Sequence, residues 1–241
     1  MKYLKQILLF LFLLPQIVIA QLKPLKINIG ASLGYMQYYA VSQSTYPELV
    51  FFKPDIFESP DLRNFQVFAE LESARKFSVT LGFGYKEIWN GHSITVYPEI
   101  GAGFTSYSDV GAYLFSNLKA GYVFKMKRFE IIPALGGSIY FSDDTAEYMS
   151  LTTIGGDIIV GPFITRQLRR SFFTIDADLQ MRYWFWGKIG LGVGASYAQG
   201  LVFINQTLGD YQWKNLSGSF ESKQKGSHTA LEIRVFYRLK S

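Results

Sequence analysis

The chain contains no cysteine and only two histidines. The lack of cysteine excludes a disulfide scaffold, thiolate metal sites and a haem-attachment motif. It is compatible with an oxidising compartment, in which a stray thiol is a liability. No phosphate-binding glycine loop, zinc-ligand spacing or calcium-binding loop pattern is present in the sequence. The sequence therefore predicts neither a cofactor nor a metal site.

Long apolar runs are also lacking after the first twenty residues. No later segment reaches the ~18 uninterrupted apolar residues expected of a membrane-spanning helix. The hydrophobicity is instead spread over many short alternating segments, and aromatic residues make up 17% of the chain. The formal net charge is only +5, without a lysine and arginine stripe dense enough for nucleic acid. We therefore expect no nucleic-acid partner.

The first twenty residues have the pattern of a secretory signal peptide. Lys2 and Lys5 precede an apolar run over residues 7–14, and Val18-Ile19-Ala20 supply small and apolar residues at the expected cut. The alternative is an uncleaved anchor, but the run is short for the ~20 residues of a spanning helix. We predict a signal peptide at 1–20 and one domain at 21–241.

The segment 172–186 shows the strand pattern most clearly. Alternate residues are apolar: Phe173, Ile175, Ala177, Leu179, Met181, Tyr183 and Phe185. The residues between them are mostly polar or charged: Thr174, Asp176, Asp178, Gln180, Arg182 and Trp184. Successive side chains of a strand point to opposite faces, so one face suits lipid and the other suits a polar lumen.

The same period recurs along the mature chain and predicts an all-β fold. We expect a closed antiparallel transmembrane β-barrel of about ten strands, within a range of eight to twelve, because only closed barrels and helices satisfy the backbone in a bilayer. The expected strands are residues 25–39, 63–73, 76–88, 92–105, 112–124, 129–141, 152–165, 172–186, 189–203 and 230–240.

Turns and connections are predicted from their composition. Asn90-Gly91 is a strong hairpin signal, and Ala74-Arg75 is a second tight turn. The long connections are residues 41–61 and 205–228, with a shorter polar one at 142–150. Segment 41–61 is apolar for a loop. It either packs over the barrel rim or forms a lid or docking surface for a protein partner.

The inward positions of the predicted strands collect charges of both signs. They are Glu70, Glu72, Lys86, Glu99, Lys119, Glu130, Asp157, Asp176, Asp178, Arg182, Glu232, Arg234 and Arg238. A barrel of eight to ten strands is narrow enough for side chains to fill it, and buried charges must pair. This favours a lumen filled by an ion-pair network over the alternative of a narrow pore for small solutes.

Two features of this face allow other interpretations. Asp176 and Asp178 could share a calcium ion or perform acid–base chemistry, although Arg182 on the same face favours structural pairing. Inward glycines at 190, 192 and 194 leave space that is either open or occupied by Trp184 or Arg182.

A lipid hydrolase is the third functional alternative. His92 follows a predicted turn next to Ser93, and His228 precedes the last predicted strand. Neither a Gly-x-Ser-x-Gly elbow nor a placed acid accompanies them. We therefore predict no catalytic residues.

Several segments resemble a known class of protein. They are Leu-Glu-Ile-Arg-Val-Phe-Tyr-Arg-Leu at 231–239, Gly-Ala-Gly-Phe at 101–104, Pro-Ala-Leu-Gly-Gly at 133–137 and Tyr-Ala-Gln-Gly-Leu at 197–201. Together they resemble small outer-membrane β-barrel domains of the Bacteroidota type, such as PorT-like and OmpX-like barrels. The resemblance implies a bacterial outer-membrane location, contact with outer-membrane lipid and handling by the outer-membrane assembly machinery. We expect a non-enzymatic barrel whose segments 41–61 and 205–228 contact a partner or ligand.

Overall fold

The computed structural model describes residues 25–44, 50–53, 64–96, 103–142, 147–154, 158–213 and 216–240. The predicted signal peptide and its cleavage site lie outside these residues. Within them, no helix is long and apolar enough to cross a membrane. The described chain forms one antiparallel sheet, and its strands are β1 Leu25–Ser44, β2 Val50–Lys53, β3 Asn64–Ser73, β4 Phe77–Val96, β5 Gly103–Tyr122, β6 Phe124–Met126, β7 Phe129–Phe141, β8 Glu147–Ile154, β9 Ile158–Gln167, β10 Ser171–Phe185, β11 Ile189–Gly200, β12 Asn205–Trp213 and β13 Leu216–Lys240.

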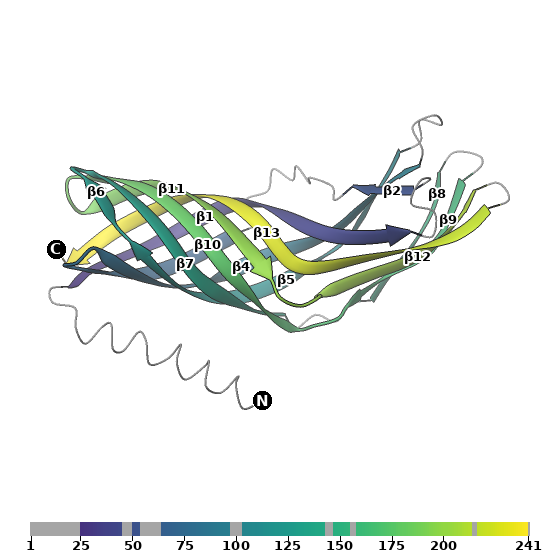
Figure 1. The fold of residues 1–241 in the computed structure, drawn as a ribbon, viewed down its shortest axis with the longest axis horizontal. Helices are drawn as coiled ribbons and strands as arrows, with labels where there is room; N and C mark the ends of the chain where they lie inside the picture. Colours follow the sequence, from purple (N-terminus) through teal and green to yellow (C-terminus); the bar gives the residue numbers. More distant parts are fainter. Residues whose placement is uncertain are drawn as a thin grey trace, which may run out of the picture.

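Eight of these strands close into a barrel, in the order β1-β3-β4-β5-β7-β10-β11-β13 (Figure 1). The first and last strands pair with each other, with Ala31 opposite Val235, so the barrel has no free edge in this part. Closure satisfies every strand edge inside a bilayer, where no water can do so. The predicted all-β barrel is confirmed, at the lower limit of the expected range of strands.

The exterior of the barrel is apolar because alternate residues point outward. Along β10 every second residue from Phe173 to Tyr183 is exposed. The residues that alternate with them, from Thr174 to Trp184, are buried. Leu81, Leu135 and Leu231 are also exposed, on three other barrel strands. In water this many exposed large apolar side chains would favour aggregation. The belt therefore faces the lipid of a bilayer, as the alternation predicts.

Several strands continue well beyond the closed barrel. A strand needs about 9–11 residues to cross a bilayer, but β13 has 25 residues and β1, β4 and β5 have 20 each. Beyond the barrel, the first part of β13 pairs with β12, which pairs with β9, and β9 pairs with β8. Figure 1 shows this group of strands flaring away from the barrel at the end opposite the C-terminus. We call it the extramembrane extension.

The extension explains why the barrel has eight strands, the lower limit of the predicted range of eight to twelve. The predicted strand at 92–105 covers the end of β4 and the start of β5, which lie beyond the barrel. The predicted strand at 152–165 is part of the β8–β9 hairpin, also outside it. Both segments alternate as barrel strands do, because a sheet in water with one covered face has the same period of two.

The predicted hairpin turn at Asn90-Gly91 is also wrong. Strand β4 runs through both residues to Val96, and β5 stays paired with it throughout. The register shifts here, since Trp89 pairs with Val110 and Asn90 with Ser108, which leaves Asp109 as a bulge. Continued pairing satisfies more backbone groups than an early turn, so tertiary structure overrides the local signal.

Both long predicted connections contain strands. Residues 41–44 belong to β1 and 50–53 form β2, which pairs with β4. Segment 205–228 consists largely of β12 and the first half of β13, not of loop. The polar connection at 142–150 includes the start of β8. Because the barrel has eight antiparallel strands, these three connecting segments all lie at the same end of it.

The opposite end has short turns, as predicted. They are at residues 74–76, 127–128 and 186–188. Lys76, Lys127 and Trp186 adopt positive φ angles of 66°, 57° and 47°, a region that favours glycine.

Replacing Leu179 by arginine tests the lipid face. Leu179 lies midway along the outward positions of β10, between Pro133 and Ala195 on the neighbouring strands. A cation near the bilayer midplane costs about 2–4 kcal/mol, so Leu179→Arg should lower the free energy of unfolding by that amount.

Urea unfolding in lipid vesicles measures this change. Leu179→Met is the matched control, expected within about 1 kcal/mol of wild type because it keeps volume and polarity. Gln180→Arg is unsuitable as a control, since Gln180 accepts a hydrogen bond from Arg234 and a second cation would face the first. Equal stability of Leu179→Arg and Leu179→Met would contradict the assignment of this face to lipid.

Candidate functional site

The barrel interior is the candidate site, because the predicted charged positions converge there. Of those positions, Glu99 and Asp157 lie outside the described residues. All the others face the interior, where Lys119 is partly buried and the rest are buried: Glu70, Glu72, Lys86, Glu130, Asp176, Asp178, Arg182, Glu232, Arg234 and Arg238. Most of these groups belong to two networks of ion pairs.

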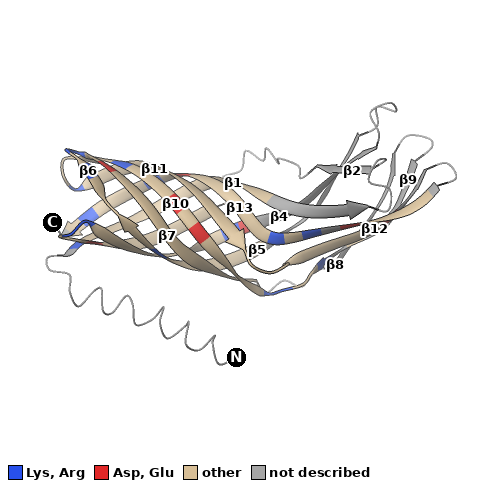
Figure 2. Ribbon diagram, viewed as in Figure 1, with Lys and Arg blue, Asp and Glu red and all other residues tan. Residues whose placement is uncertain are grey.

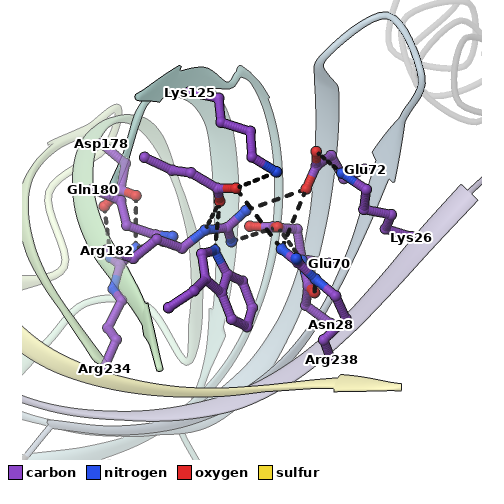
Figure 3. Close-up of polar contacts among 12 residues, drawn as sticks. Lys26, Asn28, Glu70, Glu72, Lys125, Asp178, Gln180, Arg182, Arg234 and Arg238 are labelled. Atoms are coloured by element: carbon purple, nitrogen blue, oxygen red, sulfur yellow. Dashed lines mark hydrogen bonds and ion pairs between the residues drawn. The ribbon is translucent and has the colours of Figure 1, made fainter. Parts of the chain in front are cut away.

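The first network is centred on Arg182 of β10, nearer the short turns (Figure 3). Its Nη1 donates to Glu70 Oε1 at 2.6 Å, and its Nε donates to Glu130 Oε2 at 2.6 Å. Its Nη2 lies 3.5 Å from Glu72 Oε2. Trp184 adds a hydrogen bond from its indole N–H to Glu130 Oε2 at 2.8 Å. Arg182 is only 1% exposed, so it joins carboxylates of two strands in a nearly dry environment.

Arg238 of the last strand supports the same carboxylates. Its Nη2 lies 3.9 Å from Glu72 and 3.8 Å from Glu130. Its Nε donates to Asn28 Oδ1 at 3.1 Å, and its guanidinium stacks 3.8 Å from the centre of the Trp184 ring. Strands from both ends of the chain therefore meet in one network.

Two lysines close this network toward the short turns. Lys26 pairs with Glu72 at 2.9 Å, and Lys125 pairs with Glu130 at 3.5 Å. Their side chains are 31% and 39% exposed, so they reach water while the carboxylates stay buried. Long side chains with apolar stems can cover a buried site in this way. These lysines form the polar lid of the network.

The second network is centred on Arg234 and lies further along the barrel. Its two terminal nitrogens donate hydrogen bonds to the two carboxylate oxygens of Asp178 at 2.7 and 2.9 Å, which is the bidentate geometry typical of arginine. It also donates to Glu232 at 2.9 Å and to Gln180 at 2.6 Å. Lys119 lies 3.6 Å from Asp178. Each charge in this layer has an opposite neighbour, as burial requires.

The paired aspartates bind different side chains in the structure. Asp176 accepts hydrogen bonds from Ser138 and, at 2.6 Å, from Thr174, while Asp178 is held by Arg234. The two carboxylates thus have separate donors. Among the described residues, no group of three or more histidine, aspartate or glutamate side chains could hold a metal ion.

Little space remains between the two networks. A cavity of about 20 Å³ lies between them, with Glu70, Asp178 and Arg234 in its wall. That volume holds about one water molecule. The inward glycines create no channel either, since Gly190 lies under the Trp184 ring and Gly194 under the Arg234 guanidinium. Their space is filled, which is one of the two outcomes that the sequence allowed.

An aromatic layer closes the interior toward the extramembrane extension. It consists of the buried residues Tyr113, Phe115, Tyr140, Phe172 and Ile204. The rings of Tyr140 and Phe172 stack at 4.4 Å with an angle of 4°, and Tyr113 meets Phe172 edge-on at 5.4 Å. The four aromatic residues of this layer have the same inward parity as the charges on their strands, which is the signal that could have identified them from the sequence.

Lys86 and His228 join this aromatic layer. The Lys86 ammonium donates to Tyr140 Oη at 3.1 Å, lies 4.5 Å from the centre of the Phe115 ring and is 3.2 Å from His228 Nε2. An ammonium can only donate, so Nε2 accepts and the proton is on Nδ1, which donates to the Gly226 carbonyl at 2.9 Å. Both nitrogens of His228 are engaged, so neither is available to activate a hydroxyl group. The side chain of His92 lies outside the described residues.

Comparisons with known proteins give a family and a set of distant structures. The profile of a family described as "Domain of unknown function (DUF2715)" matches residues 25–235. No curated protein matches the chain. Outer-membrane protein OprG of Pseudomonas aeruginosa is 10% identical, with 90% of this chain and 96% of that chain covered and a TM-score of 0.45. A major outer membrane protein of Thermus thermophilus is 12% identical, with coverage of 90% and 100% and a TM-score of 0.46. The attachment invasion locus protein Ail of Yersinia pestis is 9% identical, with coverage of 89% and 96% and a TM-score of 0.39.

Proposed function

The chain belongs to the family described as "Domain of unknown function (DUF2715)", and we propose that it is a non-enzymatic, non-conducting barrel of the bacterial outer membrane. In this proposal the filled barrel anchors and orients the extramembrane extension, which contacts a partner or a surface ligand. The observation that carries the proposal is the barrel interior, in which two ion-pair networks and an aromatic layer are buried.

The location follows from the exterior of the barrel. A closed eight-stranded barrel with an apolar belt is the architecture of small bacterial outer-membrane proteins. Such barrels contact outer-membrane lipid and depend on the outer-membrane assembly machinery. The narrower relationship to barrels of the Bacteroidota type stays a prediction.

The interior supports a structural role over transport. In a water-filled pore, charges are screened and side chains leave a continuous path. Here Arg182 is buried against Glu70 and Glu130, and the space between the two networks holds about one water molecule. The aromatic layer then covers the second network. A narrow pore is therefore the less favoured alternative.

The extension supports a role in contact. Its β12–β13 hairpin carries polar side chains suited to water, including an ion pair of 2.7 Å between Lys223 and Glu221. Gln206 also donates to Glu221. Strands that are continuous with the barrel hold this surface rigidly, which lowers the entropy cost of binding. We propose that the extension is the partner-binding part, in place of the long connections that the sequence predicts at 41–61 and 205–228.

The hydrolase alternative has less support. His228 is engaged on both nitrogens by Lys86 and Gly226. A lipid-hydrolysis assay on wild type, His92→Ala and His228→Ala tests it directly. Hydrolysis by wild type that either substitution abolishes would replace our proposal.

Planar-bilayer recording tests the filled interior. We expect wild-type protein to give no steady single-channel conductance above background, because the two buried ion-pair networks leave room for about one water molecule between them. The same preparation must be shown to contain folded barrel, by a difference in gel migration between unheated and heated protein. Steady, reproducible conductance steps from verified barrel would overturn the non-conducting function and favour the pore.

Fractionation tests the predicted location and processing. The mature protein should begin at Gln21, sediment with outer membranes and migrate differently before and after heating. N-terminal sequencing and membrane separation measure these properties. Recovery as a soluble periplasmic protein would contradict the transmembrane assignment.

A further inference from the structure

Exposed cations gather at the end of the barrel that has the short turns. Arg75 and Lys76 are in the first turn, Lys127 and Arg128 in the second and Lys188 in the third. All five are exposed, and we call them the basic rim. Figure 2 shows lysine and arginine at this end, near the C-terminus. Turns from three separate hairpins thus bring one sign of charge to one rim.

The basic rim has no counter-charge within the described part of the chain. None of its five residues forms an ion pair with another described residue. The nearest carboxylates along the chain, Glu72 and Glu130, are buried and held by arginines of the interior. The rim charges are therefore available to an external anion.

Aromatic side chains lie directly beside the basic rim on the outer surface. Phe77 meets Tyr122 edge-on at 5.5 Å, and Tyr122 meets Phe124 at 4.9 Å. On the far side, Phe185 lies 6.3 Å from Trp186, which is 84% exposed. Aromatic girdles of barrels lie at the level of the lipid headgroups. The basic rim is at or just beyond that level.

The backbone of two rim residues adds an independent observation. Lys76 and Lys127 have φ angles of 66° and 57°, where a side chain is disfavoured and glycine or asparagine is preferred. Unfavourable backbone conformations of this kind cluster where a side chain has a function. At both positions the chain has a cation instead of the residue that the turn favours.

We propose that the basic rim binds the phosphates of anionic phospholipids in the leaflet next to the short turns. Ammonium and guanidinium groups both bind phosphate oxygens through charge-assisted hydrogen bonds. Anionic headgroups attract each nearby lysine or arginine with a preference of about fivefold. The barrel would thereby gather a shell of anionic lipid at one rim. This inference rests on the proposed membrane location.

Quenching of Trp186 by brominated lipids tests the inference at the rim itself. Full-length mature barrel is reconstituted in phosphatidylcholine vesicles that contain either brominated phosphatidylglycerol or brominated phosphatidylcholine. The difference between wild type and Trp186→Phe isolates the signal of this tryptophan. We expect brominated phosphatidylglycerol to be preferred several-fold at low salt, and the preference to weaken as salt screens the charges.

A rim variant with Lys76→Gly, Lys127→Gly and Lys188→Gln should reduce that several-fold preference to nearly none. Glycine suits both positive-φ positions, so this variant should fold, which heat-modifiable migration verifies. The charge-keeping variant Lys76→Arg, Lys127→Arg and Lys188→Arg should retain the preference. The matched control, Arg169→Gln, Arg170→Gln and Lys225→Gln, removes three cations away from the short turns and should leave Trp186 quenching unchanged.

The outcomes separate this inference from the proposed function. Equal quenching by both lipids, or equal loss in the rim variant and the matched control, overturns lipid binding by the rim while the barrel stays in the bilayer. No quenching by either lipid overturns the membrane location itself. Displacement by inorganic phosphate beyond that by chloride at equal ionic strength overturns the lipid assignment in favour of a free phosphate ion.

Discussion

Replacing Arg182 by alanine should lower the free energy of unfolding of the barrel by about 3–5 kcal/mol. The guanidinium is buried and bonded to Glu70 and Glu130 at 2.6 Å each. Its loss leaves two buried carboxylates without their nearest cation, and Arg238 is 3.8 Å away from only one of them. The penalty comes from the charges left behind, not from the net strength of the original pair. Urea unfolding in lipid vesicles, followed by tryptophan fluorescence, measures the change.

Lys26→Ala is the matched control, because Lys26 makes an ion pair in the same network at the wet end. Its side chain is 31% exposed, and exposed pairs contribute about 0–1 kcal/mol. A similar small effect of Arg182→Ala would mean that water screens the interior. Together with steady conductance, such a result would replace the filled barrel by a channel.

The inward positions of the barrel could be predicted from the sequence with good accuracy. Along β10, every residue from Thr174 to Trp184 with inward parity is buried. The reason is that the side chains of a strand alternate between two faces, and only the apolar set of side chains can face lipid. A charge such as Asp178 or Arg182 therefore identifies its own face.

The partners of those charges could not be predicted. Arg182 on β10 meets Glu70 on β3, and these strands are separated by three others in the barrel wall. Contacts across a lumen depend on strand number, tilt and stagger, which no local pattern contains. Asp178 shows the same limit, since it pairs with Arg234 on the last strand and not with its neighbour Arg182.

The number of barrel strands is at the lower limit of the predicted range for a related reason. Segments 92–105 and 152–165 alternate like barrel strands but belong to the extramembrane extension. An alternating pattern predicts a strand with two different faces, but it does not distinguish a strand in lipid from a strand in water. His228 shows the opposite error. It was expected in a connection but lies within β13, against Lys86 in the interior.

Phe172→Ala should cost about 3–5 kcal/mol of unfolding free energy, the range for a buried phenylalanine in a well-packed core. Phe172 stacks on Tyr140, meets Tyr113 edge-on and lies over Gly226, where a Cβ would come within 2.6 Å of its ring. Removing the ring therefore opens a cavity among residues held by several strands, which cannot collapse to fill it. The same unfolding assay measures the effect.

Phe173→Ala is the matched control, because Phe173 is the next residue and is 40% exposed on the outer face. It loses contacts mainly with lipid, so its cost should be clearly smaller than that of Phe172→Ala. A larger effect of Phe173→Ala would contradict the aromatic layer as a packed closure of the interior.

The double variant Arg182→Ala with Phe172→Ala tests whether the two layers act separately. The residues are ten positions apart on one strand, or about 33 Å at ~3.3 Å per residue, and no contact partner is common to both. Their costs should then add to within about 0.5 kcal/mol. Conductance should stay at background in Phe172→Ala, because the Arg182 and Arg234 networks still fill the barrel beneath the missing ring. Conductance in this single variant would mean that the aromatic layer alone seals the interior and that the charged networks admit ions.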